Sequence, residues 1–260
     1  MDKLAASEFE RQLRKHAGHS PPPALNLTHV TSHAKMMTIL REGAFGSDRD
    51  CKVYGERLLY TFYGRPAYRP TRNEEDLVHD DVIYAPVCFL VKPSVIGDAK
   101  RALPFDSGGY VHYGPTMHPS WTKDDFAIEC TPDSVTAVIS TFWASDVDYL
   151  SSRPKLTLNI PASHDRLRQY HRLITAALTR KFDTRCSTVE LQFTVPLVLE
   201  DKIVAVIVPD EAMDQDLIEF AVGLGAELIP YRYETPFRPE DFLRSIHFAV
   251  QDYYRPGSRA

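Results

Sequence analysis

Apolar side chains recur along this chain at spacings that predict short helices and strands in mixed order. Phe9 and Leu13 stand at helical spacing among charged residues, which predicts an amphipathic helix over residues 5–17. A strand over residues 24–30 follows, and then a helix over residues 34–43. Later segments repeat both patterns. They predict strands at 58–63, 83–91, 188–193, 203–208 and 228–233, and helices at 163–181, 214–222 and 239–254.

Residues 104–121 break this pattern. The segment is dense in Gly, Pro, Tyr and His and has no consistent period, which predicts a long loop of functional importance. Elsewhere helices and strands mix without a strict strand–helix–strand repeat, so we expect an α+β fold rather than a doubly wound sheet. We expect an N-terminal helical extension over 1–20 and a single domain over 21–260.

The composition narrows the class of protein. The 260 residues are 43% hydrophobic and 25% charged, which is typical of a globular protein. The net charge of -5 argues against a protein that binds mainly duplex phosphate. The four cysteines form no CxxC pair, the N-terminus is too charged for a signal peptide, and no apolar run is long enough to span a bilayer. We therefore expect a cytoplasmic protein with no membrane partner.

Three familiar kinds of site are poorly supported. Asp106-Ser107-Gly108-Gly109 looks like a serine-protease nucleophile loop, but the predicted helices do not fit that architecture, and a turn capped by Asp106 or Ser107 explains the segment better. No histidine or cysteine spacing indicates a metal site. No glycine-rich dinucleotide loop or P-loop sequence occurs.

Glu190 is the most unusual residue of the predicted strands. Its neighbours are Val, Leu and Phe, and a carboxylate in such a strand is costly unless it is paired or functional. The alternative is that Glu190 points to solvent, because Thr188, Glu190 and Gln192 alternate with apolar residues.

Three segments, taken in order, resemble the ADP-ribosyltransferase superfamily, and within it the DarT-type toxins that modify DNA bases. These are the sequences Leu27-Thr28-His29-Val30-Thr31-Ser32, Tyr60-Thr61-Phe62-Tyr63-Gly64-Arg65-Pro66-Ala67-Tyr68-Arg69 and Ser187-Thr188-Val189-Glu190-Leu191-Gln192-Phe193. The resemblance covers about residues 25–70 and 185–210. It implies a split β-sandwich with flanking helices, and NAD⁺ as co-substrate without a metal.

The resemblance also implies roles for individual residues. Glu190 would stabilise the oxocarbenium-like transition state formed when nicotinamide leaves, and Arg65 would bind the diphosphate or orient Glu190. His29 would hold the adenosine-side ribose and Thr31 would contact nicotinamide. Tyr63 or Tyr68 would stack on nicotinamide. For His29 and Arg65 a purely structural role is the alternative.

The acceptor of the ADP-ribose group is less well defined. Arg65, Arg69 and Arg72 alternate with aromatic residues, as in proteins that bind single-stranded nucleic acid, although acidic residues follow directly. We expect a toxin or defence enzyme that modifies a macromolecule, with nucleic acid favoured over protein, and an antitoxin or regulatory partner. The alternatives are an NAD⁺ glycohydrolase and an inactive binding module of the same fold.

Overall fold

The structure is a computed structural model that describes residues 6–17, 24–47, 49–51, 53–67, 81–178 and 184–255. The helices are α1 (Glu8–His16), α2 (His33–Glu42), α3 (Tyr110–Tyr113), α4 (Pro132–Phe142), α5 (Asp146–Leu150), α6 (Asp165–Ala177), α7 (Gln215–Leu224) and α8 (Leu243–Tyr253). The strands are β1 (Leu27–Ser32), β2 (Ala44–Phe45), β3 (Arg49–Cys51), β4 (Glu56–Tyr63), β5 (Pro86–Val91), β6 (Arg101–Leu103), β7 (Glu190–Phe193), β8 (Leu197–Val198), β9 (Ile203–Pro209) and β10 (Glu227–Tyr231).

The main sheet of the described strands runs in the order β10-β9-β5-β1-β4-β7-β6, with β3 paired to β4. All of these pairs are antiparallel except β9 with β10, which are parallel and joined through α7. Strands β1 and β4 are paired at only two positions, Leu27 with Tyr63 and Thr28 with Phe62. This short ladder, which we call the β1–β4 joint, links the two halves of the sheet.

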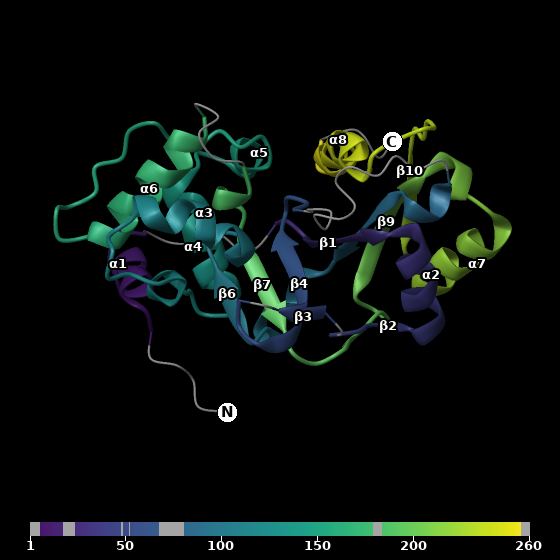
Figure 1. Ribbon diagram of the computed structural model, residues 1–260, viewed down its shortest axis with the longest axis horizontal. Coiled ribbons are helices and arrows are strands. Elements are labelled where there is room, and N and C mark those ends of the chain that lie inside the picture. The colour runs from purple at the N-terminus through teal and green to yellow at the C-terminus, as the bar shows by residue number, and fades with distance from the viewer. Residues whose placement is uncertain are drawn as a thin grey trace.

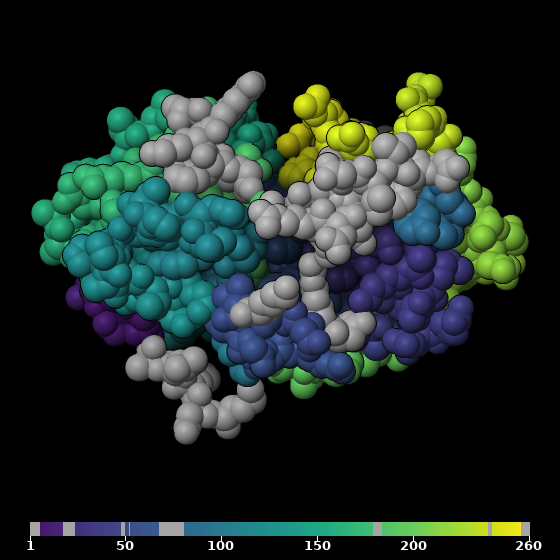
Figure 2. All heavy atoms as spheres, in the orientation of Figure 1, coloured from purple at the N-terminus to yellow at the C-terminus, as the bar shows by residue number. Residues whose placement is uncertain are grey.

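The helices divide between the two halves of the sheet. Helices α1 and α3 to α6 gather around β6 and β7, whereas α2, α7 and α8 lie on the side of β9 and β10 (Figure 1). The molecular face drawn in Figure 2 is hollowed along the line where the two groups meet. The sheet is therefore mixed and covered by helices, which agrees with the predicted α+β class.

Helix α1 belongs to the same hydrophobic core as the sheet. Phe9 and Leu13 are fully buried, and the ring of Phe9 packs edge-on against Tyr170 of α6 with centroids 5.5 Å apart. The helical spacing of these two residues predicted the helix, which packs into this core.

Several predicted elements agree with the structure. Helix α2 begins after Ser32, whose side chain caps the backbone N–H of Lys35, and it ends at Gly43 in the left-handed region with φ of 66°. The strand expected over 83–91 is shorter, because Val82–Tyr84 forms a 3-10 helix before β5 begins. Between residues 121 and 163, where no element was predicted, the chain forms α4 and α5.

The prediction of a loop over 104–121 was wrong in its local structure. The segment contains a 3-10 helix at Ser107–Gly109, the short helix α3, and a second 3-10 helix at Gly114–Thr116. The rings of Tyr110 and Tyr113 pack against Phe105, with centroids 5.7 and 5.4 Å from its own. Aromatic packing orders this segment where backbone periodicity gives no signal. No helix among the described residues is both long and apolar enough to cross a membrane.

Candidate functional site

Strand β7 is buried along its whole length, polar residues included. Glu190 is 1% exposed and Gln192 is 0% exposed, and Thr188, just before the strand, is 2% exposed. The alternative in which Glu190 points to solvent is therefore wrong. Because residues two apart in a strand face the same side, these side chains form a polar row inside the protein.

Glu190 accepts two hydrogen bonds from the protein. The backbone N–H of Ser107 donates to Oε2 at 3.1 Å, and Nε2 of Gln192 donates to Oε1 at 2.6 Å. Burial and, to a smaller extent, the negative charge of Asp106 raise the pKa of Glu190, the hydrogen bonds from Gln192 and Ser107 lower it, and the net result is a pKa of about 8. The site therefore holds an acid that is largely protonated at neutral pH.

The segment over 104–121 lies directly against this acid. Ser107 donates its N–H to Glu190, and its hydroxyl accepts a hydrogen bond from Nε2 of Gln192 at 3.2 Å. Asp106 caps the 3-10 helix through the N–H of Gly108 and pairs with Arg185 at 3.4 Å. The predicted cap at this turn is confirmed. The turn closes over Glu190, which explains why so little of the carboxyl group is exposed.

A polar chain leads from Glu190 towards the surface. Nη1 of Arg101 donates to Oε1 of Gln192 at 3.2 Å and also pairs with Glu56. The guanidinium of Arg101 and the ammonium of Lys123 lie 4.2 and 4.3 Å from the ring centroid of Tyr54. Burial raises the pKa of the Tyr54 phenol, the charges of Asp124 and Glu190 raise it further, and Arg101 and Gln192 lower it in part.

Sequence reasoning missed most of this cluster. The turn over 106–109 was considered as a protease loop and set aside, and Tyr54 and Arg101 carried no motif. One signal did exist, since Gln192 alternates with Glu190 in an otherwise apolar strand. Two polar residues at that spacing indicate a shared face, and burial makes each the natural partner of the other.

Arg65 lies just after β4 and is 1% exposed. Its Nη2 donates to the hydroxyls of Ser187 and Thr188 at 2.9 and 2.7 Å and to the carbonyl of Ser187, and Nη1 donates to Ser152. The guanidinium carbon lies 4.5 Å from the ring centroid of Tyr149. Nε has no partner among the described residues, but it is buried as well. The protein itself therefore occupies both ends of this guanidinium.

The three strands that carry the predicted residues are neighbours. Strand β1 holds His29 and Thr31, β4 holds Tyr63, and β7 holds Glu190, and they follow one another as β1-β4-β7. Arg65, bound to the two residues before Val189, is joined to the Glu190 strand by direct contacts.

The side chains do not all share one face, however. Glu190 is paired with Phe62, and Phe62 with Thr28, so these three point to the same side of the sheet. By alternation, Tyr63, His29 and Thr31 point to the other side.

The cofactor-binding candidates differ in their surroundings. The His29 ring reaches the Tyr60 carbonyl at 2.8 Å, beyond the end of the β1–β4 joint, and so lies in the wedge where the two strands diverge. Thr31 is 7% exposed, and Tyr63 is fully buried with its hydroxyl bound to the N–H of Leu25. Tyr68 lies outside the described residues.

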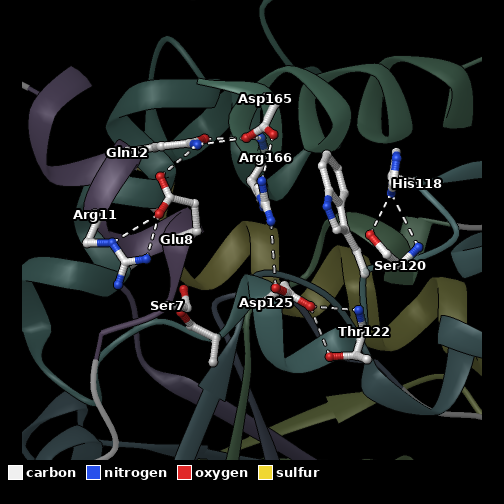
Figure 3. A network of polar contacts seen from close by, with 12 residues as sticks. Ser7, Glu8, Arg11, Gln12, His118, Ser120, Thr122, Asp125, Asp165 and Arg166 are labelled. Carbon is white, nitrogen blue, oxygen red and sulfur yellow. Dashed lines mark hydrogen bonds and ion pairs between the residues drawn. The ribbon is translucent and has the colours of Figure 1, made fainter. Parts of the chain in front are cut away.

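An open polar pocket of about 480 Å³ lies apart from Glu190, where α1 and α6 meet the 3-10 helix Lys123–Phe126. Its lining consists of Ala6, Ser7, Glu8, Arg11, Thr122, Asp124, Asp125 and Arg166. Figure 3 shows that the lining charges pair with one another, Arg11 with Glu8 at 2.5 Å and Arg166 with Asp125 at 3.9 Å. It also shows that Gln12 of α1 donates to Glu8 and to Asp165 of α6. The network ties α1 to α6. Asp124 connects it to the Glu190 cluster, because its Oδ1 lies 3.5 Å from the Tyr54 hydroxyl.

The Glu190 cluster can hold or release a proton and can stabilise a positive charge once Glu190 ionises. Within the described part of the chain, no group of three or more His, Cys, Asp or Glu side chains is placed to hold a metal ion. Comparison with protein-family models, with curated proteins and with solved structures gives no match for this chain. The geometry around Glu190 and the resemblance of the three segments are the features that bear on function.

Proposed function

We propose that this protein is an ADP-ribosyltransferase that cleaves the nicotinamide–ribose bond of NAD⁺ and transfers ADP-ribose to a macromolecular acceptor, with nucleic acid favoured over protein. The observation that carries the proposal is Glu190, a fully buried acid on the strand that follows β1 and β4 in the sheet. A buried carboxyl group with a strongly raised pKa is typical of functional sites. The order of the three strands also agrees with the order of the three resembling segments.

In this reaction nicotinamide leaves with the electron pair of the C–N bond, and the ribose carbon develops positive charge. Ionised Glu190 would hydrogen-bond a ribose hydroxyl and stabilise that charge. The acceptor then forms the new bond to the ribose carbon and gives up its proton, which Glu190 can take. Glu190 is largely protonated at neutral pH. Binding of a cationic nicotinamide ring would favour its ionised form, because an opposite charge lowers a carboxyl pKa.

Access to Glu190 requires the turn at 106–109 to move. Both carboxyl oxygens already accept hydrogen bonds, one of them from Ser107 in that turn. A ribose hydroxyl that binds Oε2 therefore has to replace the Ser107 N–H. In this proposal the segment over 104–121 therefore borders the substrate site.

The other predicted residues take supporting roles in the proposal. Arg65 orients the Glu190 strand rather than binding the diphosphate, because both of its NH₂ groups bind the chain itself and its Nε is buried. His29 contacts the Tyr60 carbonyl where β1 and β4 diverge, and its side chain points to the side of the sheet opposite Glu190. Tyr63 acts as a core residue, and any stacking role falls to Tyr68.

The preference for nucleic acid rests on residues 65–72 of the sequence. Arg65 is buried and does not join a surface cluster. Arg69 and Arg72 lie outside the described residues, so they carry this part of the proposal by sequence alone. A toxin or defence role, with an antitoxin or regulatory partner, follows only from the resemblance to DarT-type toxins.

The test is nicotinamide release from NAD⁺ by the whole protein, without acceptor and with single-stranded DNA, RNA or cell lysate. We expect release that depends on nucleic acid, and a loss of at least about 100-fold in Glu190→Gln. Release that needs no acceptor would instead identify an NAD⁺ glycohydrolase. NAD⁺ binding without turnover would identify an inactive binding module. A protein that neither binds nor cleaves NAD⁺ would overturn the proposal.

A further inference from the structure

The Gln192 side chain is held in one orientation by a partner that can only donate. An amide presents an oxygen acceptor at one end and an NH₂ donor at the other, and the two ends have nearly the same shape. Arg101 donates to the oxygen at 3.2 Å, and a guanidinium has no acceptor to offer. The NH₂ end must therefore face Glu190 and Ser107, where it makes hydrogen bonds of 2.6 and 3.2 Å.

We propose that Arg101 and Gln192 are positioning residues for Glu190: Arg101 fixes the direction of the Gln192 amide, and the amide, together with the Ser107 N–H, holds both oxygens of Glu190 as acceptors. The catalytic meaning of this relay rests on the proposed function of Glu190. The relay itself consists of contacts within the protein, so it can be tested without NAD⁺.

The relay makes a specific demand on the side chain at position 190. Both neighbours present N–H groups to it. Each oxygen of a carboxyl group, protonated or ionised, keeps a lone pair that can accept, whereas an amide NH₂ group can only donate. In Glu190→Gln the new NH₂ group faces either the Ser107 N–H or the Gln192 NH₂ group. Gln192 cannot relieve this by turning over, because its own NH₂ group would then face Arg101.

Exchanging the two side chains restores every hydrogen bond. In the double variant Glu190→Gln/Gln192→Glu, the amide oxygen at 190 accepts from Ser107 and the amide NH₂ donates to the carboxylate at 192. That carboxylate also accepts from Arg101 and from the Ser107 hydroxyl. The exchange keeps size and composition constant and moves the carboxyl group by two positions.

Thermal unfolding of the two single variants and the double variant tests the relay. We expect Glu190→Gln to lower the melting temperature by roughly 3 to 8 °C, since it buries unmatched donors. Gln192→Glu should lower it as well, because it places two carboxyl groups side by side. The double variant should regain most of the loss. The proposal would be overturned if the double variant lost as much melting temperature as the two single variants together.

A second measurement examines Arg101 through the titration of Glu190, followed by ¹³C NMR of its carboxyl carbon. In Arg101→Met the Gln192 amide is free to turn its oxygen towards Glu190. Because two acceptors repel unless one carries a proton, the midpoint should rise by about one pH unit. Arg101→Lys, which keeps a donor, should move it much less.

Glu56→Gln is the matched control, because it breaks the ion pair of Arg101 but leaves the contact with Gln192 in place. We expect this variant to leave the midpoint of Glu190 nearly unchanged. An equal shift in Glu56→Gln and Arg101→Met, or no shift in Arg101→Met, would overturn the relay. If the native protein does not turn over NAD⁺ while the stability and titration results are as expected, the proposed function is wrong and the relay still holds.

Discussion

At the scale of single residues, the burial of Glu190 has a direct consequence for stability. Its pKa is raised to about 8, chiefly by desolvation, from an ordinary value of 4.5. Between these two pH values the folded protein keeps a proton that the unfolded chain has released. The unfolded state therefore binds fewer protons, and the free energy of unfolding falls as pH rises through this range.

We expect Glu190 to contribute a slope of at most about 1.4 kcal/mol per pH unit between about pH 4.5 and 8, and none above or below that range. Chemical denaturation at a series of pH values measures it. Histidines with a lowered pKa, such as His16 and His33, make the free energy of unfolding rise with pH instead. They are present in both the native chain and Glu190→Gln, so their contribution cancels when the two are compared. The difference between the native chain and Glu190→Gln isolates the carboxyl group. A difference independent of pH would show that Glu190 titrates near its ordinary value.

At the scale of elements, Arg65 joins the end of β4 to the 3-10 helix Thr184–Ser187 that leads into β7. Five N–H groups on a planar fork can bind several acceptors at once, which an ammonium group cannot do in the same geometry. The hydroxyls of Ser187 and Thr188 and the carbonyls around them surround one NH₂ group of this fork, Nη2. The position of Glu190, two residues beyond Thr188, thus depends on Arg65.

Arg65→Ala should lower the free energy of unfolding by about 3 kcal/mol, because it leaves several buried acceptors without partners. In folded protein it should lower kcat for nicotinamide release more than it raises KM. Arg65→Lys should recover only part of either loss. Arg57→Ala is the control, since the Arg57 side chain is 69% exposed and should matter little. A pure rise in KM for NAD⁺ in Arg65→Lys would instead indicate a diphosphate contact.

At the scale of the whole molecule, α1 holds together elements that are far apart in the sequence. Phe9 contacts the rings of Phe126, Phe142 and Tyr170, which lie in three different helical segments. Glu10 is buried on the same helix, where it binds Arg14 and the hydroxyl of Ser134. Helix α1 therefore packs together the helical segments of the half of the molecule that carries the Glu190 cluster.

Phe9→Ala should lower the free energy of unfolding by about 3–5 kcal/mol, as expected for a large side chain removed from a packed core. Urea denaturation provides the measurement. The matched control is Leu156→Ala, whose side chain is 70% exposed and should change stability by less than about 0.5 kcal/mol. If both variants lose equally little, α1 is not part of the cooperative unit.

The sequence by itself determined the elements whose signals are local. The ends of α2 are of this kind, because the caps at Ser32 and Gly43 depend on a side-chain oxygen and on backbone freedom at single positions. Glu190 was identified because a charge among apolar neighbours is costly wherever the strand lies. The α+β class followed from helical and strand periodicities that succeed one another along the chain without a regular repeat.

Only the tertiary structure decided which side chains meet Glu190. Ser107 and Arg101 are distant in sequence, and strand pairing with a packed turn brings them to Gln192 and Glu190. The register of the β1–β4 joint and the alternation of side chains along β1 also decided that His29 and Glu190 point to opposite sides of the sheet. Such pairings depend on non-local packing, because a shift of register by one residue reverses every side chain of a strand. A single sequence does not contain that information at any one position.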